Sequence, residues 1–273
     1  MTFDCTSGPS LWPDTITAVA EVDQALSKRV LVETELTPRF PPEGSGAAVS
    51  ESAPSKLLIR LADTDGHRSQ ASYLVRKMYG WRGYDTQAAT EHPNCVTLVA
   101  STGPKPLATI TVGFDSRAGM AVESLYPDEV WRLRSEGARV CEFTRLAVDR
   151  TEHSRELLAM IFHVAYMYAR WLHGSSDLLI EVNPRHVRFY MRMLGFQRLG
   201  PERICPRVNA PAVLMWLPLA YAEQQIRLHA GRHCPPIGVR SLYPLFFSPA
   251  EERGITARLR AIDGQSVSAL EPA

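Results

Sequence analysis

Hydrophobic positions follow two different periods along the chain, and these periods predict the secondary structure. Runs rich in β-branched and aliphatic residues predict strands at 57–61, 95–100, 107–114, 139–148, 178–182 and 212–217. Apolar residues three and four positions apart predict helices at 66–79, 127–134, 154–172 and 183–194. Strands come first, and a strand–helix–strand–helix–strand order follows. The pattern therefore predicts an α/β (α+β) fold with a mixed sheet flanked by helices.

The helix expected at 154–172 is the most apolar long segment. Ser154 suits its N-cap and Gly174 its C-terminal stop. Its apolar stripe covers more than half of the circumference, which is typical of a core helix packed against a sheet. His163 and Arg170 interrupt the segment, and it is too short to span a bilayer. No transmembrane segment is expected.

Composition divides the chain into three parts. Prolines and the stretch EGSGAA at 43–48 predict a flexible N-terminal arm or linker over 1–54. Periodic signals are dense over 55–219, which we expect to be one domain, and 220–273 is a C-terminal extension. The N-terminus does not read as a signal peptide, and the five scattered cysteines include no CxxC pair. These features favour a reduced, cytoplasmic protein.

Overall charge excludes little, but one region is strongly basic. With 30 Lys+Arg and 29 Asp+Glu, the net charge is +1. Six arginines and one acidic residue nevertheless lie between 184 and 207, and Arg185, Arg188 and Arg192 share one helical face. This face is either simply solvated or a docking surface for an acidic partner. Nucleic acid is disfavoured as a partner, because the patch is short and lacks interleaved aromatic platforms.

Two segments carry a resemblance to a known family. The strand EFTRLAVD at 142–149 resembles an E-x-x-R-(L/F)-x-V motif, and 183–196 is similar to the N…Y…LGF ending of many GNAT (Gcn5-related N-acyltransferase) proteins. Together they resemble bacterial long-chain N-acyl amino acid synthases, which are related to acyl-homoserine-lactone autoinducer synthases. The resemblance covers about 56–219. The segment 109–137 matches the amino acid synthases better than the lactone synthases.

The resemblance implies a fold, an activity and a set of site residues. The fold is a GNAT-like, mostly antiparallel sheet, and the activity is transfer of an acyl group to the amine of an amino acid. No tightly bound cofactor and no metal are expected. The substrate-binding positions that the resemblance implies are Arg76, Trp81, Asp85, Thr144, Asn183 and Tyr190. One extra residue between Tyr190 and Gly195 departs from the common spacing.

The turn after the E-x-x-R strand bears on the acyl donor. Proteins of the fold that use acetyl-CoA carry an (R/Q)-x-x-G-x-(G/A) turn, whose backbone N–H groups hold the pyrophosphate. Here 149–155 reads DRTEHSR and contains no glycine. Side chains would crowd a pyrophosphate, so acyl-phosphopantetheine on an acyl carrier protein is the expected donor rather than a CoA thioester. In the related families such carriers are acidic, and Arg185, Arg188 and Arg192 are the expected carrier-binding residues.

Acyl transfer from a thioester to an amine needs a base and a partner for the acceptor carboxylate. Glu142 is the leading base, because burial on a central strand disfavours its charged form; Glu181 is the competing carboxylate. Arg145 and Arg76 are the expected partners of the acceptor carboxylate. Each of these residues could instead form a structural ion pair. Glu142 and Arg145 are three residues apart, so they share one face of the strand only if a bulge intervenes.

Two other functions remain open. The same-class alternative is an autoinducer synthase of the acyl-homoserine-lactone type, although Asp85 is single and Thr111-Val112 replaces an Arg-Leu pair. The alternative of another class is a catalytically silent GNAT-fold binding or accessory module. His229, His233 and Cys234 have the spacing of metal ligands, but no second pair is nearby in the sequence.

Overall fold

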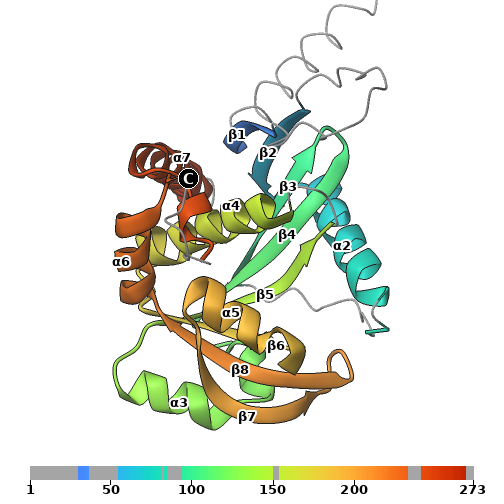
Figure 1. Cartoon of the computed structure of the whole chain (residues 1–273), viewed down its shortest axis with the longest axis vertical. Coiled ribbons are helices and arrows are strands. Elements are labelled where there is room, and N and C mark those ends of the chain that lie inside the picture. Colours follow the sequence, from blue (N-terminus) through green and yellow to red (C-terminus); the bar gives the residue numbers. More distant parts are fainter. Residues whose placement is uncertain are drawn as a thin grey trace, which may run out of the picture.

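The structure is a computed structural model, and it describes residues 30–36, 55–81, 83–84, 94–149, 154–232 and 241–268. The strands of these residues form one eight-stranded sheet in the order β1-β2-β3-β4-β5-β6-β8-β7 (Figure 1). The strands are β1 (Val30–Leu36), β2 (Ser55–Leu61), β3 (Cys95–Thr102), β4 (Lys105–Phe114), β5 (Val140–Val148), β6 (Asp177–Val182), β7 (Gln197–Cys205) and β8 (Ala210–Pro218). Neighbours are antiparallel except β5 and β6, which are parallel. The predicted mixed, mostly antiparallel sheet is confirmed.

Helices cover both faces of the sheet. The α-helices of the described residues are α2 (Asp65–Gly80), α3 (Pro127–Ser135), α4 (Ser154–Met167), α5 (Val187–Leu194), α6 (Leu219–His229) and α7 (Pro249–Ser268). Short turns are η1 (Ala121–Ser124), η3 (Pro184–His186) and η4 (Tyr243–Leu245), and a π-helical turn, η2 (Tyr168–Leu172), continues α4. Helices α2 and α4 both pack on β3–β5 (Figure 1). Among the helices that the structure describes, none combines the length and apolar character needed to cross a bilayer.

The apolar pattern of each helix explains how much of the helix is buried. Along α4, the predicted stripe is buried almost throughout, and even His163 is fully buried. Burial lowers the pKa of His163 to about 3, and its Nδ1 accepts a hydrogen bond from the Phe247 N–H at 3.1 Å. In α2 only Ala71 and Leu74 are buried, as expected for a helix at the surface.

Two segments outside the predicted elements complete the sheet. Val30–Leu36 lies inside the range 1–54 expected to be a flexible arm, and it forms the edge strand β1, whose Leu31 and Val32 are buried. At the other edge is β7, a polar strand that the apolar pattern did not predict. The Nε of Arg258 on α7 donates to the Leu31 carbonyl at 2.8 Å, so the two ends of the described chain meet.

The C-terminal segments share the core of the sheet. Tyr243, Phe246 and Leu259 belong to the same buried cluster as α4 and β1–β6. The Tyr243 hydroxyl donates to the Leu194 carbonyl at 2.7 Å, which connects η4 to the end of α5. The division of the chain at 54 and 219 stays a prediction, while the described parts of both flanking segments pack on the sheet.

Candidate active site

A cavity opens where β5 and β6 separate. Their parallel pairing stops at Phe143 and Ile180, although β5 continues to Val148. The register of β5 against β4 shifts beside Arg145, which has a left-handed φ of 50°. Such a bulge bends a strand and increases its twist. The space beside the bulged strand is a cavity of about 880 Å³.

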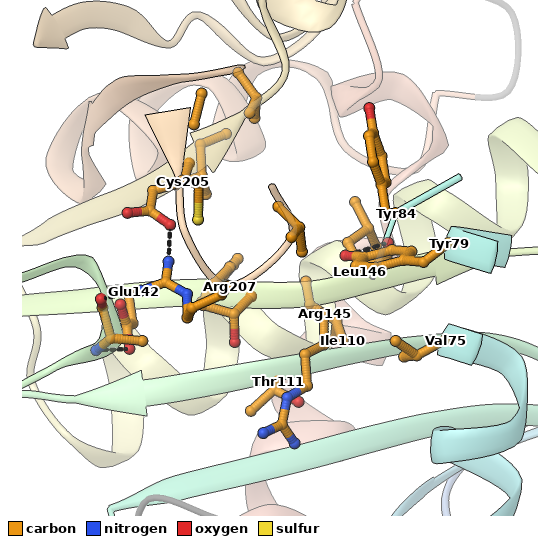
Figure 2. Close-up of a pocket in the computed structure, with 18 of the residues that line it drawn as sticks. Val75, Tyr79, Tyr84, Ile110, Thr111, Glu142, Arg145, Leu146, Cys205 and Arg207 are labelled. Carbon is orange, nitrogen blue, oxygen red and sulfur yellow. Dashed lines mark hydrogen bonds and ion pairs between the residues drawn. The ribbon is translucent and has the colours of Figure 1, made fainter. Parts of the chain in front are cut away.

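The cavity has a charged end and an apolar end. Figure 2 shows Glu142 and Arg207 at one side of the site, and Val75, Tyr79 and Leu146 at the other. The charged end is formed by η1, β5, β6 and the β7–β8 hairpin, and the apolar end is covered by α2. A site with these two ends can hold an apolar chain and a polar reacting group together.

Glu142 is buried and held by the backbone. Glu142 is only 3% exposed. Its two carboxylate oxygens accept hydrogen bonds from the N–H groups of Ala121 and Val122, each at 2.8 Å. Gly113 pairs with Glu142 across β4 and β5, and a Cβ at Gly113 would lie 2.8 Å from the Glu142 Cγ. The glycine therefore provides the space in which Glu142 reaches the start of η1.

Glu181 faces the same cavity with a different environment. Its Oε2 forms an ion pair with Arg207, while its Oε1 is buried and has no hydrogen-bond partner among the described residues. Burial raises the pKa of Glu181 to about 7; repulsion from Glu142 also raises it, and the Arg207 guanidinium opposes both. A carboxylate with this pKa can accept a proton near neutral pH.

Arg207 belongs to the basic region between 184 and 207, and no sequence motif marks it as a site residue. It lies in the turn of the β7–β8 hairpin and lines the cavity. Its guanidinium bonds the Ala121 carbonyl and the Ser124 hydroxyl, in addition to Glu181. The position of Arg207 at the end of a hairpin follows only if β7 is recognised as a strand, and no apolar pattern marks β7.

Arg145 reaches the cavity because of the β5 bulge. Both Glu142 and Arg145 line the cavity, as expected for residues three apart when a bulge lies between them. The Arg145 charge acts on Cys95 of β3: burial and Glu142 raise the pKa of that thiol, and Arg145 lowers it. Arg145 thus extends toward β3, whereas Arg207 extends toward β6 (Figure 2).

Three more predicted site residues line the cavity, namely Thr144, Asn183 and Tyr190. The Asn183 side chain is engaged locally. Its Oδ1 accepts from the Arg185 N–H at 3.2 Å, which caps η3, and its Nδ2 donates to the Pro211 carbonyl at 3.3 Å. Asn183 therefore fixes the junction of β6, η3 and β8 at the cavity wall.

The predicted residues from the α2 region do not join this group. Arg76 is exposed on α2, Trp81 is 65% exposed, and neither lines the cavity. Asp85 lies outside the described residues. Tyr79 and Tyr84 from the same region line the cavity instead.

A second hollow, of about 420 Å³, lies between α4 and α5. Its lining residues are Arg155, Arg188, Phe189, Arg192 and Met193. The structure thus brings Arg188 and Arg192 together with an arginine from the start of α4. Arg185 is turned elsewhere, because its Nε donates to the Asn183 Oδ1 at 2.9 Å. Of the glycine-free turn, residues 150–153 lie outside the described part of the chain.

The described residues support neither a metal site nor a nucleophilic cysteine at Cys141. Within the described ranges no group of three or more His, Cys, Asp and Glu side chains could hold a metal ion, and His233 and Cys234 fall outside those ranges. Burial raises the pKa of the Cys141 thiol to about 12, so this cysteine stays protonated and inert.

Comparison with known proteins defines first the class and then the family. The protein is an acyltransferase, an N-acyltransferase with a GNAT-like α/β fold. The family model described as N-acyl amino acid synthase FeeM matches residues 70–218, more than half of the chain, and the chain belongs to this family. The resemblance stated from the two motifs is confirmed. No curated protein matches the chain significantly.

The chain is also similar to solved structures. The structure of FeeM, an N-acyl amino acid synthase from uncultured soil microbes, is 25% identical, with a TM-score of 0.57, covering 62% of this chain and 95% of FeeM. The acyl-homoserine-lactone synthase LasI is 11% identical (TM-score 0.44), covering 60% of this chain and 91% of LasI. An acyl-CoA N-acyltransferase from Pseudomonas aeruginosa is 15% identical (TM-score 0.43), covering 59% of this chain and 98% of that one.

Proposed function

We propose that this N-acyltransferase moves a long-chain acyl group from an acyl carrier protein thioester to the amine of an amino acid, with Glu181 as the general base. The observation that carries the proposal is the pair of carboxylates in one cavity, of which Glu181 keeps an unpartnered oxygen and a pKa raised to about 7. Membership in the N-acyl amino acid synthase family supports the choice of acceptor.

The chemistry needs one proton to leave the acceptor before attack. Glu181 takes a proton from the acceptor's ammonium group, and the free amine attacks the thioester carbonyl carbon. The C–N bond forms and the C–S bond breaks. The attacking nitrogen then gives up one of its two remaining protons, which neutralises the departing thiolate and leaves the amide N–H. The thioester is already activated, so the reaction needs no resident cofactor.

Glu142 is the alternative base, and its contacts favour a supporting role. Two backbone N–H groups bond its oxygens, and bonds of this kind stabilise the charged carboxylate. Both Glu142 oxygens are engaged by these N–H groups, whereas Glu181 keeps an open oxygen that can receive a proton. We assign Glu142 to holding η1 beside the cavity, where Ala121 in turn bonds Arg207.

The acyl chain is assigned to the apolar end of the cavity. Val75, Tyr79, Ile110, Leu146 and Phe162 line it from α2, β4, β5 and α4. Of the long apolar stripe of α4, Phe162 is the residue that reaches the cavity lining, so the rest of the stripe serves packing. Thr144 and Tyr190 also line the cavity and are assigned as substrate contacts.

The donor's carrier is assigned to the hollow between α4 and α5. Arg155, Arg188 and Arg192 give it three positive charges around the apolar Phe189 and Met193. An acidic carrier protein or the phosphate of its phosphopantetheine arm is complementary to this surface.

The test is a thiol-release assay with acyl carrier protein loaded with acyl chains of several lengths, against each of the twenty amino acids. We expect an N-acyl amino acid, identified by mass spectrometry, and a loss of about 10²–10⁴ in rate for Glu181→Gln. Release of an acyl-homoserine lactone from S-adenosylmethionine instead would identify the autoinducer alternative. Absence of thiol release with every acceptor would indicate a silent module.

A further inference from the structure

Arg207 has an unusual combination of contacts and exposure. Its side chain is 37% exposed, although it bonds Glu181 on β6 and both the Ala121 carbonyl and the Ser124 hydroxyl of η1. It therefore crosses the charged end of the cavity and remains within reach of a ligand. A guanidinium presents five donors in a planar fork that matches a carboxylate.

Glu181 is asymmetrically satisfied by this contact. Arg207 occupies Oε2, and Oε1 has no partner among the described residues, with only 11% of the side chain exposed. A buried carboxylate with one open oxygen depends on its counter-ion to stay charged. Any group that draws Arg207 away from Glu181 therefore raises the pKa of Glu181 and makes it a stronger base.

We propose that Arg207 binds the carboxylate of the acceptor and, by exchanging Glu181 for it, activates Glu181 as the base. An α-amino acid carries both required groups on one carbon. Its carboxylate pairs with the Arg207 guanidinium, and its ammonium donates a proton to Glu181, which Arg207 no longer contacts. This inference rests on the proposed function and adds a selectivity to it, because an amine without a carboxylate cannot perform the exchange.

The direction of the effect follows from the groups that face Glu181. Glu142 from β5 raises the pKa of Glu181, and Arg207 from the hairpin lowers it. The charge of Glu181 in turn raises the pKa of Tyr126, at the N-cap of α3. Burial raises the pKa of Tyr126 to about 12, so it stays neutral at physiological pH. Arg207 is thus the group that holds the Glu181 pKa down, and its withdrawal moves this pKa further toward that of the acceptor's ammonium.

The other two arginines that line the cavity are less well placed for this exchange. Arg68 bonds the Asp63 carbonyl and the Asp65 carboxylate on its own side of the cavity. The Arg145 charge acts on Cys95 of β3, and Figure 2 shows the Arg145 side chain extending away from Arg207. The causes of the Glu181 pKa shift include Arg207 and Glu142 but not Arg145. A carboxylate held at Arg145 would leave the ion pair of Glu181 intact.

The test compares amino acids with the amines that lack their carboxylate, using an acyl-pantetheine thioester as donor so that carrier binding plays no part. For wild type we expect kcat/KM to favour the amino acid by about 10- to 100-fold, which is the value of one charge-assisted pairing. Arg207→Gln should abolish this preference, mainly through a higher KM for the amino acid, and move the acid limb of the pH profile upward. Arg207→Lys should restore part of the preference.

Arg203→Gln is the matched control. Arg203 lies on β7 of the same hairpin and bonds Glu129 and the Leu125 carbonyl, but it does not line the cavity. We expect it to keep the preference for amino acids. Loss of the preference in Arg145→Gln rather than in Arg207→Gln would overturn the inference and keep the proposed function. A wild-type enzyme that favours the amines would overturn both.

Discussion

The two halves of the sheet, β1–β5 and β6–β8, differ in how their charged groups are held. Among the strands that the structure describes, they are joined by the short parallel pairing of β5 and β6 that ends at Phe143 and Ile180. In the β1–β5 half, Glu142 is bonded by two backbone N–H groups beside a glycine that its side chain requires. In the β6–β8 half, Glu181 keeps an open oxygen, and its partner Arg207 is partly exposed.

This difference indicates a division of labour. The β1–β5 half, with α2 and α4, supplies the residues of the apolar end of the cavity, whereas the β6–β8 half supplies the Glu181–Arg207 ion pair. Helix α5 follows directly after β6 and η3, so Arg188 and Arg192 of the proposed carrier contact follow the strand that carries the proposed base, while Arg155 comes from α4. Substitutions in the two halves should therefore have different consequences, on stability in one and on substrate kinetics in the other.

The larger of two expected effects concerns the carrier. The double change Arg188→Glu and Arg192→Glu should raise the apparent KM for the carrier-bound donor by about 10- to 100-fold, because charge complementarity acts on encounter. Its salt dependence should weaken, and turnover of a small pantetheine thioester should change little. Steady-state kinetics at several salt concentrations measure both.

The matched control is Arg132→Glu with Arg260→Glu. Both arginines are exposed, on α3 and α7, and the net charge changes by the same amount. This variant should keep the wild-type KM. Equal losses with the carrier and with the small thioester would assign Arg188 and Arg192 to the fold or the active site.

The smaller effect concerns the β1–β5 half. Gly113→Ala places a Cβ 2.8 Å from the Glu142 Cγ, so Glu142 must move and its bonds to η1 weaken. We expect the free energy of unfolding to fall by about 1–3 kcal/mol, measured by denaturant titration, while the acid limb of activity stays near pH 7. Gly80→Ala, where a Cβ meets no atom within 4 Å, should leave stability nearly unchanged. Wild-type stability of Gly113→Ala would show that Glu142 does not hold η1.

Much of the fold could be predicted from the apolar pattern. The strands at 95–100, 107–114 and 178–182 are confirmed within a few residues as β3, β4 and β6, because their side chains are buried in the core. β7 was missed because its exposed edge carries polar residues at most positions. The helix predicted at 154–172 changes to a π-helical turn at Tyr168, a backbone change that its composition does not mark.

The residues of the site were easier to predict than their roles. Glu142, Arg145 and Glu181 stood out as charges in buried strands, and all three line the cavity. Their partners come from residues distant in sequence: Gly113 through the register of β4 and β5, and Arg207 through the hairpin turn. Such contacts depend on the tertiary fold, so the proposed choice between the two carboxylates rests on contacts that the sequence pattern does not contain.

The most direct test of the central claim is the pH dependence of kcat/KM for Glu142→Gln and Glu181→Gln beside wild type, with a small thioester donor. A base must be deprotonated to act, so wild-type activity should rise with pH through about 7, the pKa of Glu181. Glu142→Gln should keep this limb, whereas Glu181→Gln should lose it together with about 10²–10⁴ in rate. A limb that persists in Glu181→Gln and disappears in a folded Glu142→Gln would contradict the account and make Glu142 the base.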